Sequence, residues 1–112
     1  MIIRHCAAQS ETTAHGFSKW VLLPGGVLPS VTQLAVAELP PGAVVEMHSH
    51  PTMYEVFYPL DGEADYILRE MTHSVGPGDL VVVEPGVRHS LRAGRDGHRV
   101  LYFGISTASN PV

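Results

Sequence analysis

Glycine and proline interrupt this chain at short, regular intervals, and these interruptions limit the elements that it can form. Groups of turn-forming residues occur at 24–26, 40–42, 61–62, 76–78, 85–86 and 94–97. Between them lie segments of strand length that are rich in Val, Leu, Tyr and Ile, at 31–39, 43–48, 54–60, 63–70, 79–84, 87–93 and 98–105. None reaches the roughly 10 to 12 residues expected of a helix. The spacing therefore predicts an all-β domain, either an antiparallel sandwich or a barrel.

The length and composition of the chain favour a single domain with one core. It has 112 residues, of which 45% are hydrophobic and 16% charged, and a formal net charge of -4. A mildly acidic chain gives no reason to expect a nucleic-acid partner. No apolar run approaches the roughly 18 residues of a membrane span, and the N-terminus lacks an apolar segment long enough for a secretory signal. We therefore expect a soluble, cytoplasmic protein with no nucleic-acid or membrane partner.

The first 30 residues differ from the rest, and we expect an N-terminal arm or strand at 1–30 followed by a barrel domain at 31–112. The only tryptophan, Trp20, lies in this first part, within FSKWVLLPGG. The segment either packs as an arm across the barrel or onto a partner subunit, or it forms an ordinary edge strand of the same barrel. The single Cys6 cannot form an intrachain disulfide, and we expect it to be an inert thiol.

The stretch HSHPTMYE, residues 48–55, is a candidate metal-binding segment. Side chains alternate between the two faces of a strand, so His48 and His50 should project to the same side. Pro51 favours a break in the strand, after which Glu55 would begin the neighbouring strand opposite the histidines. Two histidines in this spacing are a weak signal on their own, because a solvated or hydrogen-bonded pair on a sheet face would show the same pattern.

The residues around this pair follow a longer pattern. The first part reads Gly42, His48, His50, Glu55 and Gly62, and the second reads Gly78, Gly86 and His89. This resembles the cupin superfamily, whose first motif is G-x5-H-x-H-x3,4-E-x6-G and whose second is G-x5-P-x-G-x2-H-x3-N. The first motif matches at every fixed position. The second is looser, with Glu84 in the place of proline and Ala93 in the place of asparagine, and the resemblance covers about residues 31 to 105.

The resemblance implies an antiparallel double-stranded β-helix, the RmlC-like jelly roll of small single-domain cupins. It also implies four metal ligands, which are His48, His50, Glu55 and His89. Three imidazoles and one carboxylate suit Fe, Mn, Ni, Zn or Cu, and they leave one or two coordination positions open for water, dioxygen or a substrate. We therefore expect one divalent transition metal as cofactor. A metal-free pocket, as in cupins whose motifs have drifted, is the alternative.

Other polar and aromatic residues have ordinary explanations beside functional ones. Glu46 shares the predicted face of His48 and is a weak candidate for an acid or base lining the pocket, or else it faces solvent at the rim. Phe57 has the parity of Glu55 and is a weak candidate for an apolar wall, or else it packs in the core. No other catalytic residue is identified. We expect the remaining histidines to be surface residues, namely His5, His15, His73 and His98.

The cupin barrel serves many functions, so the fold alone does not select one. The favoured hypothesis is an enzyme, a mononuclear metal-dependent oxygenase or related lyase, acting on a small organic molecule chelated to the metal in an apolar barrel mouth. The alternative is a non-catalytic module that binds a metabolite or a metal. A metal-free sugar-nucleotide epimerase is a weaker third hypothesis, because it needs a different pairing of histidine with aspartate. A barrel this small leaves apolar surface uncovered, so we also expect a homodimer to which residues 17–23 contribute.

Overall fold

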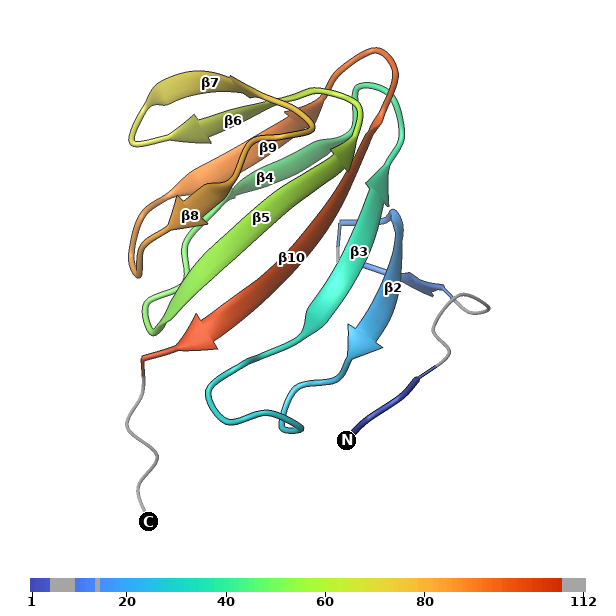
Figure 1. Ribbon diagram of the computed structural model, residues 1–112. Helices are drawn as coiled ribbons and strands as arrows, with labels where there is room; N and C mark the ends of the chain where they lie inside the picture. Colours follow the sequence, from blue (N-terminus) through green and yellow to red (C-terminus); the bar gives the residue numbers. More distant parts are fainter. Residues whose placement is uncertain (5–9, 14, 108–112) are drawn as a thin grey trace.

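The computed structural model describes residues 1–4, 10–13 and 15–107, which form two antiparallel β-sheets (Figure 1). One sheet has the strand order β1-β2-β3-β10-β5-β8 and the other has the order β4-β9-β6-β7. The described part contains no helix long and apolar enough to cross a membrane. His5 and Cys6 lie outside the described residues. The strands are β1 (Glu11–Thr12), β2 (Ser18–Leu23), β3 (Leu34–Leu39), β4 (Val44–His48), β5 (Met53–Asp61), β6 (Ala64–Leu68), β7 (Met71–Val75), β8 (Val81–Val83), β9 (His89–Ala93) and β10 (His98–Ser106).

The two sheets enclose a single apolar core, and this confirms the predicted all-β jelly roll. Alternation along the strands supplies it: in β3, Ala35, Ala37 and Leu39 are each at most 4% exposed. The register continues this inner face across the sheet, because Ala37 pairs with Val100 of β10. Each fully buried Val or Leu side chain contributes roughly 1.5–3 kcal/mol. The core cluster consists of Ala37, Leu39, Val45, Phe57, Ala64, Tyr66, Val75, Val83, Leu91, Ala93 and Val100.

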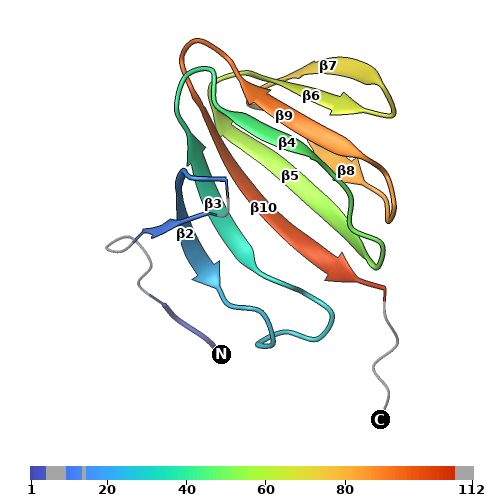
Figure 2. The same cartoon turned by 180° about the vertical axis from the view of Figure 1, so that it is seen from behind.

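The N-terminal residues extend the larger sheet along its edge. Strand β2 pairs with β3, with Trp20 opposite Val36, and β1 pairs with β2 in turn. Figure 2, the view from behind, shows β2 and β3 at the opposite end of the molecule from β6 and β7, as does Figure 1. The segment around Trp20 is therefore a strand of the larger sheet, between β3 and the short edge strand β1. The division of the chain at residue 30 stays a prediction.

Strand β7 was not expected from the sequence. It follows β6 after a turn at Arg69 and Glu70, whose φ angles are 49° and 66°, and it pairs back onto β6 with Tyr66 opposite His73. Two consecutive residues with positive φ are typical of a tight hairpin turn, in which Asn-Gly or Asp-Gly is the usual signal. This turn contains neither glycine nor asparagine, so no residue type signals a hairpin after the predicted segment 63–70. The strand that pairs with that segment was therefore not predicted.

His98 is buried, although a surface position was expected. It begins β10 on the inner face and is 2% exposed. Its Nε2 atom lies 2.8 Å from the Tyr66 hydroxyl, and its Nδ1 atom lies 3.0 Å from the carbonyl oxygen of Gly62. Both ring nitrogens have partners, which removes most of the cost of burying the ring. His98 is thus part of the core rather than of the surface.

Candidate metal centre

Four side chains from β4, β5, β9 and the turn after β4 converge inside the barrel. His48 ends β4, His50 follows in the turn, Glu55 lies in β5 and His89 begins β9. Each offers one ligand atom, and these atoms all lie within 4.8 Å of one another. The structure thus brings together the four residues that the sequence motif singles out. They form a group of three imidazoles and one carboxylate that could bind a metal.

A β-bulge in β4 turns His48 toward the other ligands. Val45 pairs with Leu91 and His48 pairs with His89, so three steps along β4 match two along β9. The bulge breaks the strict alternation of side chains. His48 consequently faces inward, with its ring centroid 4.3 Å from that of His89. Glu46, for which a pocket-lining and a solvent-facing rim position were both open, has an exposed side chain and is not among the described residues that line the pocket.

The turn that carries His50 is held against the loop before β9. The backbone N–H of Gly86 donates a hydrogen bond to the carbonyl oxygen of His50, at 2.9 Å. On the far side of the turn, the N–H of Thr107 donates to the carbonyl oxygen of Thr52, at 2.8 Å. Gly86 has a φ of 81°, which L side chains rarely adopt. The two motif segments, around His50 and His89, are therefore joined by their backbones.

Hydrogen bonds to the backbone fix which nitrogen of two rings faces the centre. His48 Nδ1 lies 2.7 Å from the carbonyl oxygen of Glu46, and His89 Nδ1 lies 3.0 Å from that of Val87. A carbonyl oxygen only accepts, so each Nδ1 must carry a hydrogen and donate it. In the neutral rings the lone pair is then on Nε2. This tautomer is the one in which the second nitrogen can bind a metal.

Glu55 provides the only carboxylate among the described residues that line this cavity. It is 8% exposed. Its Oε1 atom lies 3.0 Å from His89 Nε2 and 3.6 Å from His50 Nε2. Two cis ligands of an octahedral metal at about 2.1 Å from the ion are separated by about 3.0 Å, and tetrahedral ligands by about 3.4 Å. The 3.0 Å separation matches the octahedral value and is also that of a hydrogen bond, and the 3.6 Å separation is slightly longer than the tetrahedral value.

One buried atom of the group has no hydrogen-bond partner. His50 Nε2 is the only fully buried side-chain nitrogen or oxygen atom in the described residues that lacks one. An orphaned buried polar atom is costly, commonly by about 1–3 kcal/mol. A divalent transition metal would accept the lone pairs of all three Nε2 atoms and neutralise the carboxylate. The donor set and its orphaned atom thus fit such a metal.

The protonation of the rings depends on these contacts. Burial lowers the pKa of His50; the charge of Glu55 opposes this shift, while His48 and His89 add to it. Burial alone would also lower the pKa of His89, but the hydrogen bonds with Glu55 and the Val87 carbonyl raise it overall. His89 therefore takes up a proton more readily than an ordinary histidine, and that proton would lie between Nε2 and Glu55. A metal must displace this proton.

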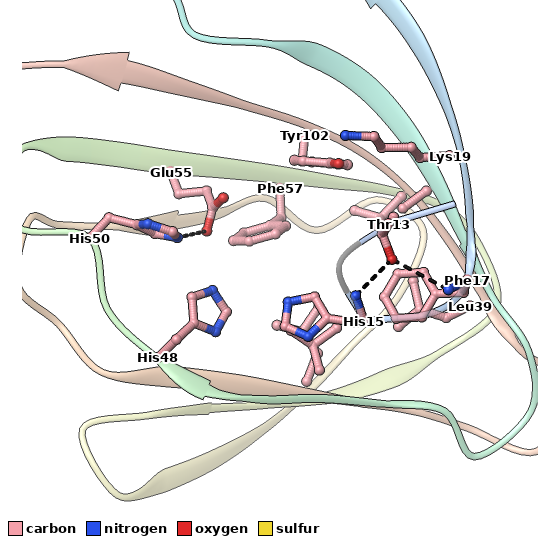
Figure 3. A pocket seen from close by; sticks show the side chains of 14 residues that line it. Thr13, His15, Phe17, Lys19, Leu39, His48, His50, Glu55, Phe57 and Tyr102 are labelled. Atoms are coloured by element: carbon pink, nitrogen blue, oxygen red, sulfur yellow. Dashed lines mark hydrogen bonds and ion pairs between the residues drawn. The ribbon is translucent and has the colours of Figure 1, made fainter. Parts of the chain in front are cut away.

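An apolar pocket of about 230 Å³ adjoins the quartet (Figure 3). Phe57 belongs to the core cluster and also lines this pocket, with its ring centroid 6.2 Å from that of His89. Five aliphatic side chains add to this wall, and Tyr102 of β10 adds a hydroxyl. The apolar residues of the wall are Phe17, Ala37, Leu39, Val45, Phe57, Leu91 and Val100. The pocket can therefore exclude water from a small molecule beside the quartet.

The N-terminal segment contributes to this pocket, which sequence reasoning missed. Thr13, His15, Phe17 and Lys19 line it. His15 is exposed, as expected, yet its ring centroid lies 5.7 Å from that of His48. The shared parity of Lys19 in β2 and of Phe17, two residues before it, is the sequence signal that could have indicated them. It required knowing that β2 pairs with β3.

Known proteins with the same architecture were found by structure, whereas no curated protein matches the chain by sequence. A predicted oxalate decarboxylase from Thermotoga maritima superposes with a TM-score of 0.81 and 22% identity, over 95% of this chain and 99% of that chain. KdgF from a Halomonas species superposes with a TM-score of 0.73 and 18% identity, over 87% of each chain. Oxalate decarboxylase from Bacillus subtilis, a protein with Mn(II) centers, superposes with a TM-score of 0.74 and 20% identity. The superposition covers 95% of this chain but only 30% of the decarboxylase chain, which is longer.

At these identities the structural neighbours establish the fold, and the family rests on the sequence. Residues 35–104 match the family model of the cupin domain. This range contains all four residues of the quartet and both glycine-containing motifs around them. Because the match spans more than half of the sequence, the chain belongs to the cupin family.

Proposed function

We propose that the protein is a metal-dependent cupin enzyme that acts on a small organic molecule by a dioxygenase-like or lyase-like reaction. The observation that carries this proposal is the orphaned Nε2 atom of His50, buried beside a carboxylate oxygen that also faces His89. His48, His50, Glu55 and His89 would hold one divalent transition metal, which is Fe, Mn, Ni, Zn or Cu. When bound, it supplies Lewis acidity or a path for electrons to a chelated substrate.

The protein side chains would position the substrate and exclude water. Phe57 and its aliphatic neighbours form a wall beside His89, which strengthens electrostatic interactions within the pocket. Tyr102 stacks on Phe57, with ring centroids 6.2 Å apart. Burial, followed by the charges of Glu55 and Glu11, raises the pKa of Tyr102. Its hydroxyl therefore stays protonated at neutral pH and can donate a hydrogen bond or a proton to a substrate oxygen.

A second function, non-catalytic binding of a metabolite or a metal, is favoured by one observation. Apart from Glu55, no carboxylate lines the pocket within the described residues. A reaction that needs a protein general base would have to use a metal ligand or one of the rings for that step. The same barrel could therefore bind a small molecule without converting it.

Oxygen uptake and turnover by metal-loaded protein distinguish the two functions. The protein is purified without an affinity tag, its metal content is measured, and small phenols, diols and β-diketones are tested for oxygen consumption and product formation. Metal-dependent turnover that His50→Gln abolishes and His73→Gln preserves supports the enzyme. Full metal loading with tight binding and no turnover supports the binding module. Turnover that is equal with and without metal contradicts both.

A further inference from the structure

We propose that the pocket recognises a small organic acid which chelates the metal at one end and carries a carboxylate at the other, and that Lys19 binds this distal carboxylate. The Tyr102 hydroxyl assists as a second donor. This inference rests on the proposed metal-dependent function of the same pocket, and it adds the class of substrate and the residue that selects it. Lys19 is the only lysine in the chain.

Lys19 faces the pocket because of the strand register. It pairs with Ala37 of β3, which pairs with Val100 of β10, and all three residues line the pocket. The next residue, Trp20, has the opposite parity and faces outward. The pairing of β2 with β3 thus directs the ammonium group of Lys19 into the barrel rather than into solvent. In Figure 3 Lys19 and His50 lie at opposite sides of the cavity.

The register also shows that Lys19 and the quartet are at different ends of the pocket. Val100 pairs with Pro59 of β5, four residues along that strand from Glu55. Between Lys19 and β5 there are three interstrand steps of about 4.8 Å each, and four residues along a strand add about 13 Å before curvature. A ligand can therefore contact the quartet and Lys19 only through two different groups.

The ammonium group of Lys19 has no anionic partner among the described residues. Its Nζ donates one hydrogen bond, to Oε1 of Gln33 at 2.9 Å. Gln33 is neutral, and an ammonium group has three hydrogens to donate. Glu11 lies opposite Lys19 in the β1–β2 register, but no ion pair within 4.0 Å joins the two. The positive charge of Lys19 therefore remains available to a ligand.

Tyr102 offers a second donor on the same inner face. It pairs with Ala35, which also pairs with Val21, two residues from Lys19 along β2. Within the described part of the chain no hydrogen bond is formed by the Tyr102 hydroxyl, which lines the pocket and stays protonated. Lys19 can only donate, and a protonated Tyr102 has a hydrogen to give. The group that binds between them should thus be an acceptor, and a carboxylate accepts with two oxygens.

The charge of the pocket favours a doubly anionic ligand. A divalent cation with Glu55 and neutral imidazoles leaves one positive charge at the quartet, and Lys19 adds another at the far end. Buried charges are costly unless they are paired, and most of the remaining wall is apolar. A ligand with one anionic oxygen at each end balances both charges. The volume of about 230 Å³ is smaller than that of most pockets for drug-sized ligands, which indicates a small acid.

A matched pair of probes tests this inference on the full chain. 3,4-Dihydroxybenzoate and 3,4-dihydroxybenzamide have the same shape and the same chelating diol, and they differ in the charge of the distal group. Their dissociation constants are measured by calorimetry on protein incubated with Mn(II), and the metal content of each sample is determined. The acid should bind about 10-fold to 100-fold more tightly than the amide, as expected for a charged hydrogen bond.

Three variants connect this preference to Lys19. Lys19→Met should remove the preference for the acid, and Lys19→Arg should keep most of it. Arg92→Met is the control for net charge, because Arg92 is exposed on β9 and outside the pocket, and it should leave the preference unchanged. Metal content should be equal in all of them, since Lys19 is no ligand.

The outcomes separate this inference from the proposed metal site. Equal binding of acid and amide to wild-type protein, or binding of neither, overturns the role of Lys19. A preference that survives Lys19→Met overturns it as well. Metal bound in stoichiometric amount together with equal binding contradicts only the role of Lys19. A preference that depends on Lys19 in protein without metal supports that role and contradicts the metal site.

Discussion

The Nε2 atom of His89 lies 3.0 Å from Oε1 of Glu55, while Nδ1 of the same ring lies 3.0 Å from the carbonyl oxygen of Val87. Both ring nitrogens therefore face oxygens that accept hydrogen bonds. Without a metal, the His89 ring can donate a hydrogen bond to both oxygens only when it carries two hydrogens, and these contacts raise its pKa. A cation beside Nε2 makes the second hydrogen unnecessary. A metal that binds at this site would thus compete with a proton.

Metal retention should consequently fall in mild acid. The rings must be unprotonated to bind, and an ordinary histidine takes up its proton near pH 6.5. Because the pKa of His89 is raised, proton competition should begin above that pH and become stronger as the pH falls. Dialysis of Mn(II)-loaded or Zn(II)-loaded protein at pH 8, 7, 6 and 5, followed by elemental analysis, measures this loss. Equal metal content at pH 5 and pH 8 would contradict histidine ligation.

The buried His98 should make the stability of the protein depend on pH. Burial lowers the pKa of His98, against the opposing effect of the Gly62 carbonyl. The ring is then neutral in the folded protein, while the unfolded chain binds a proton below about pH 6.5. This contribution to the free energy of unfolding is complete above pH 6.5. It decreases as the pH falls from 6.5 toward the lower folded pKa.

Urea unfolding between pH 8 and pH 5 tests this dependence by difference. His98→Gln should reduce the loss of stability in acid relative to wild type. His73→Gln is the matched control, because His73 is exposed on β7, and it should retain the wild-type dependence. An identical pH dependence in wild type and His98→Gln would show that His98 does not titrate as its burial requires.

Gly62→Ala should destabilise the fold strongly. Gly62 has a φ of 72°, and a Cβ atom there would overlap the carbonyl oxygen of Gly97. Gly26→Ala is the control, with a φ of 90° and no atom within 4 Å of the added Cβ. In the control variant the free energy of unfolding should fall by about 1–2 kcal/mol, because alanine is strained in a left-handed backbone conformation. Chemical denaturation should show a clearly larger fall in the free energy of unfolding for Gly62→Ala than for the control. Equal falls in the two variants would mean that the Gly97 carbonyl moves aside freely.

The outer face of the larger sheet should form a homodimer interface. In register across it lie Trp20, Leu101 and Tyr58, together with Val36, which is already buried within the single chain. Tyr58 is 45% exposed and Val82, on neighbouring β8, is 46% exposed. Sedimentation at micromolar concentration should show a dimer that Leu101→Arg dissociates. Val44→Arg, an exposed change on the smaller sheet, should leave it intact. A monomeric wild-type protein would contradict this assembly.

Much of the fold was predictable because its information is local. Glycine and proline mark most turns, and short apolar segments between them become strands. Strand β7 was not predicted, because the positive φ angles at Arg69 and Glu70 are imposed by the hairpin and not by residue types that favour them. The burial of His98 was not predicted, because it depends on Tyr66, which is 32 residues away along the chain.

The site shows the same division between local and long-range information. His48, His50 and Glu55 lie close in sequence, so their spacing identifies them. Glu46 could not be assigned to the pocket or to the rim, because a β-bulge changes the alternation just before His48 and no residue type there signals it. Lys19 was not considered, because its side chain reaches the pocket only through the pairing of β2 with β3.

The metal content of His50→Gln compared with that of His73→Gln tests the proposed site most directly. His50 Nε2 has no hydrogen-bond partner to lose, so His50→Gln should leave the metal-free fold intact. Wild type and His73→Gln should each bind one divalent metal per chain by calorimetry and elemental analysis, and His50→Gln should bind it at least 10-fold more weakly. Equal affinity in all three proteins, or no binding by any of them, would contradict a metal centre formed by the quartet.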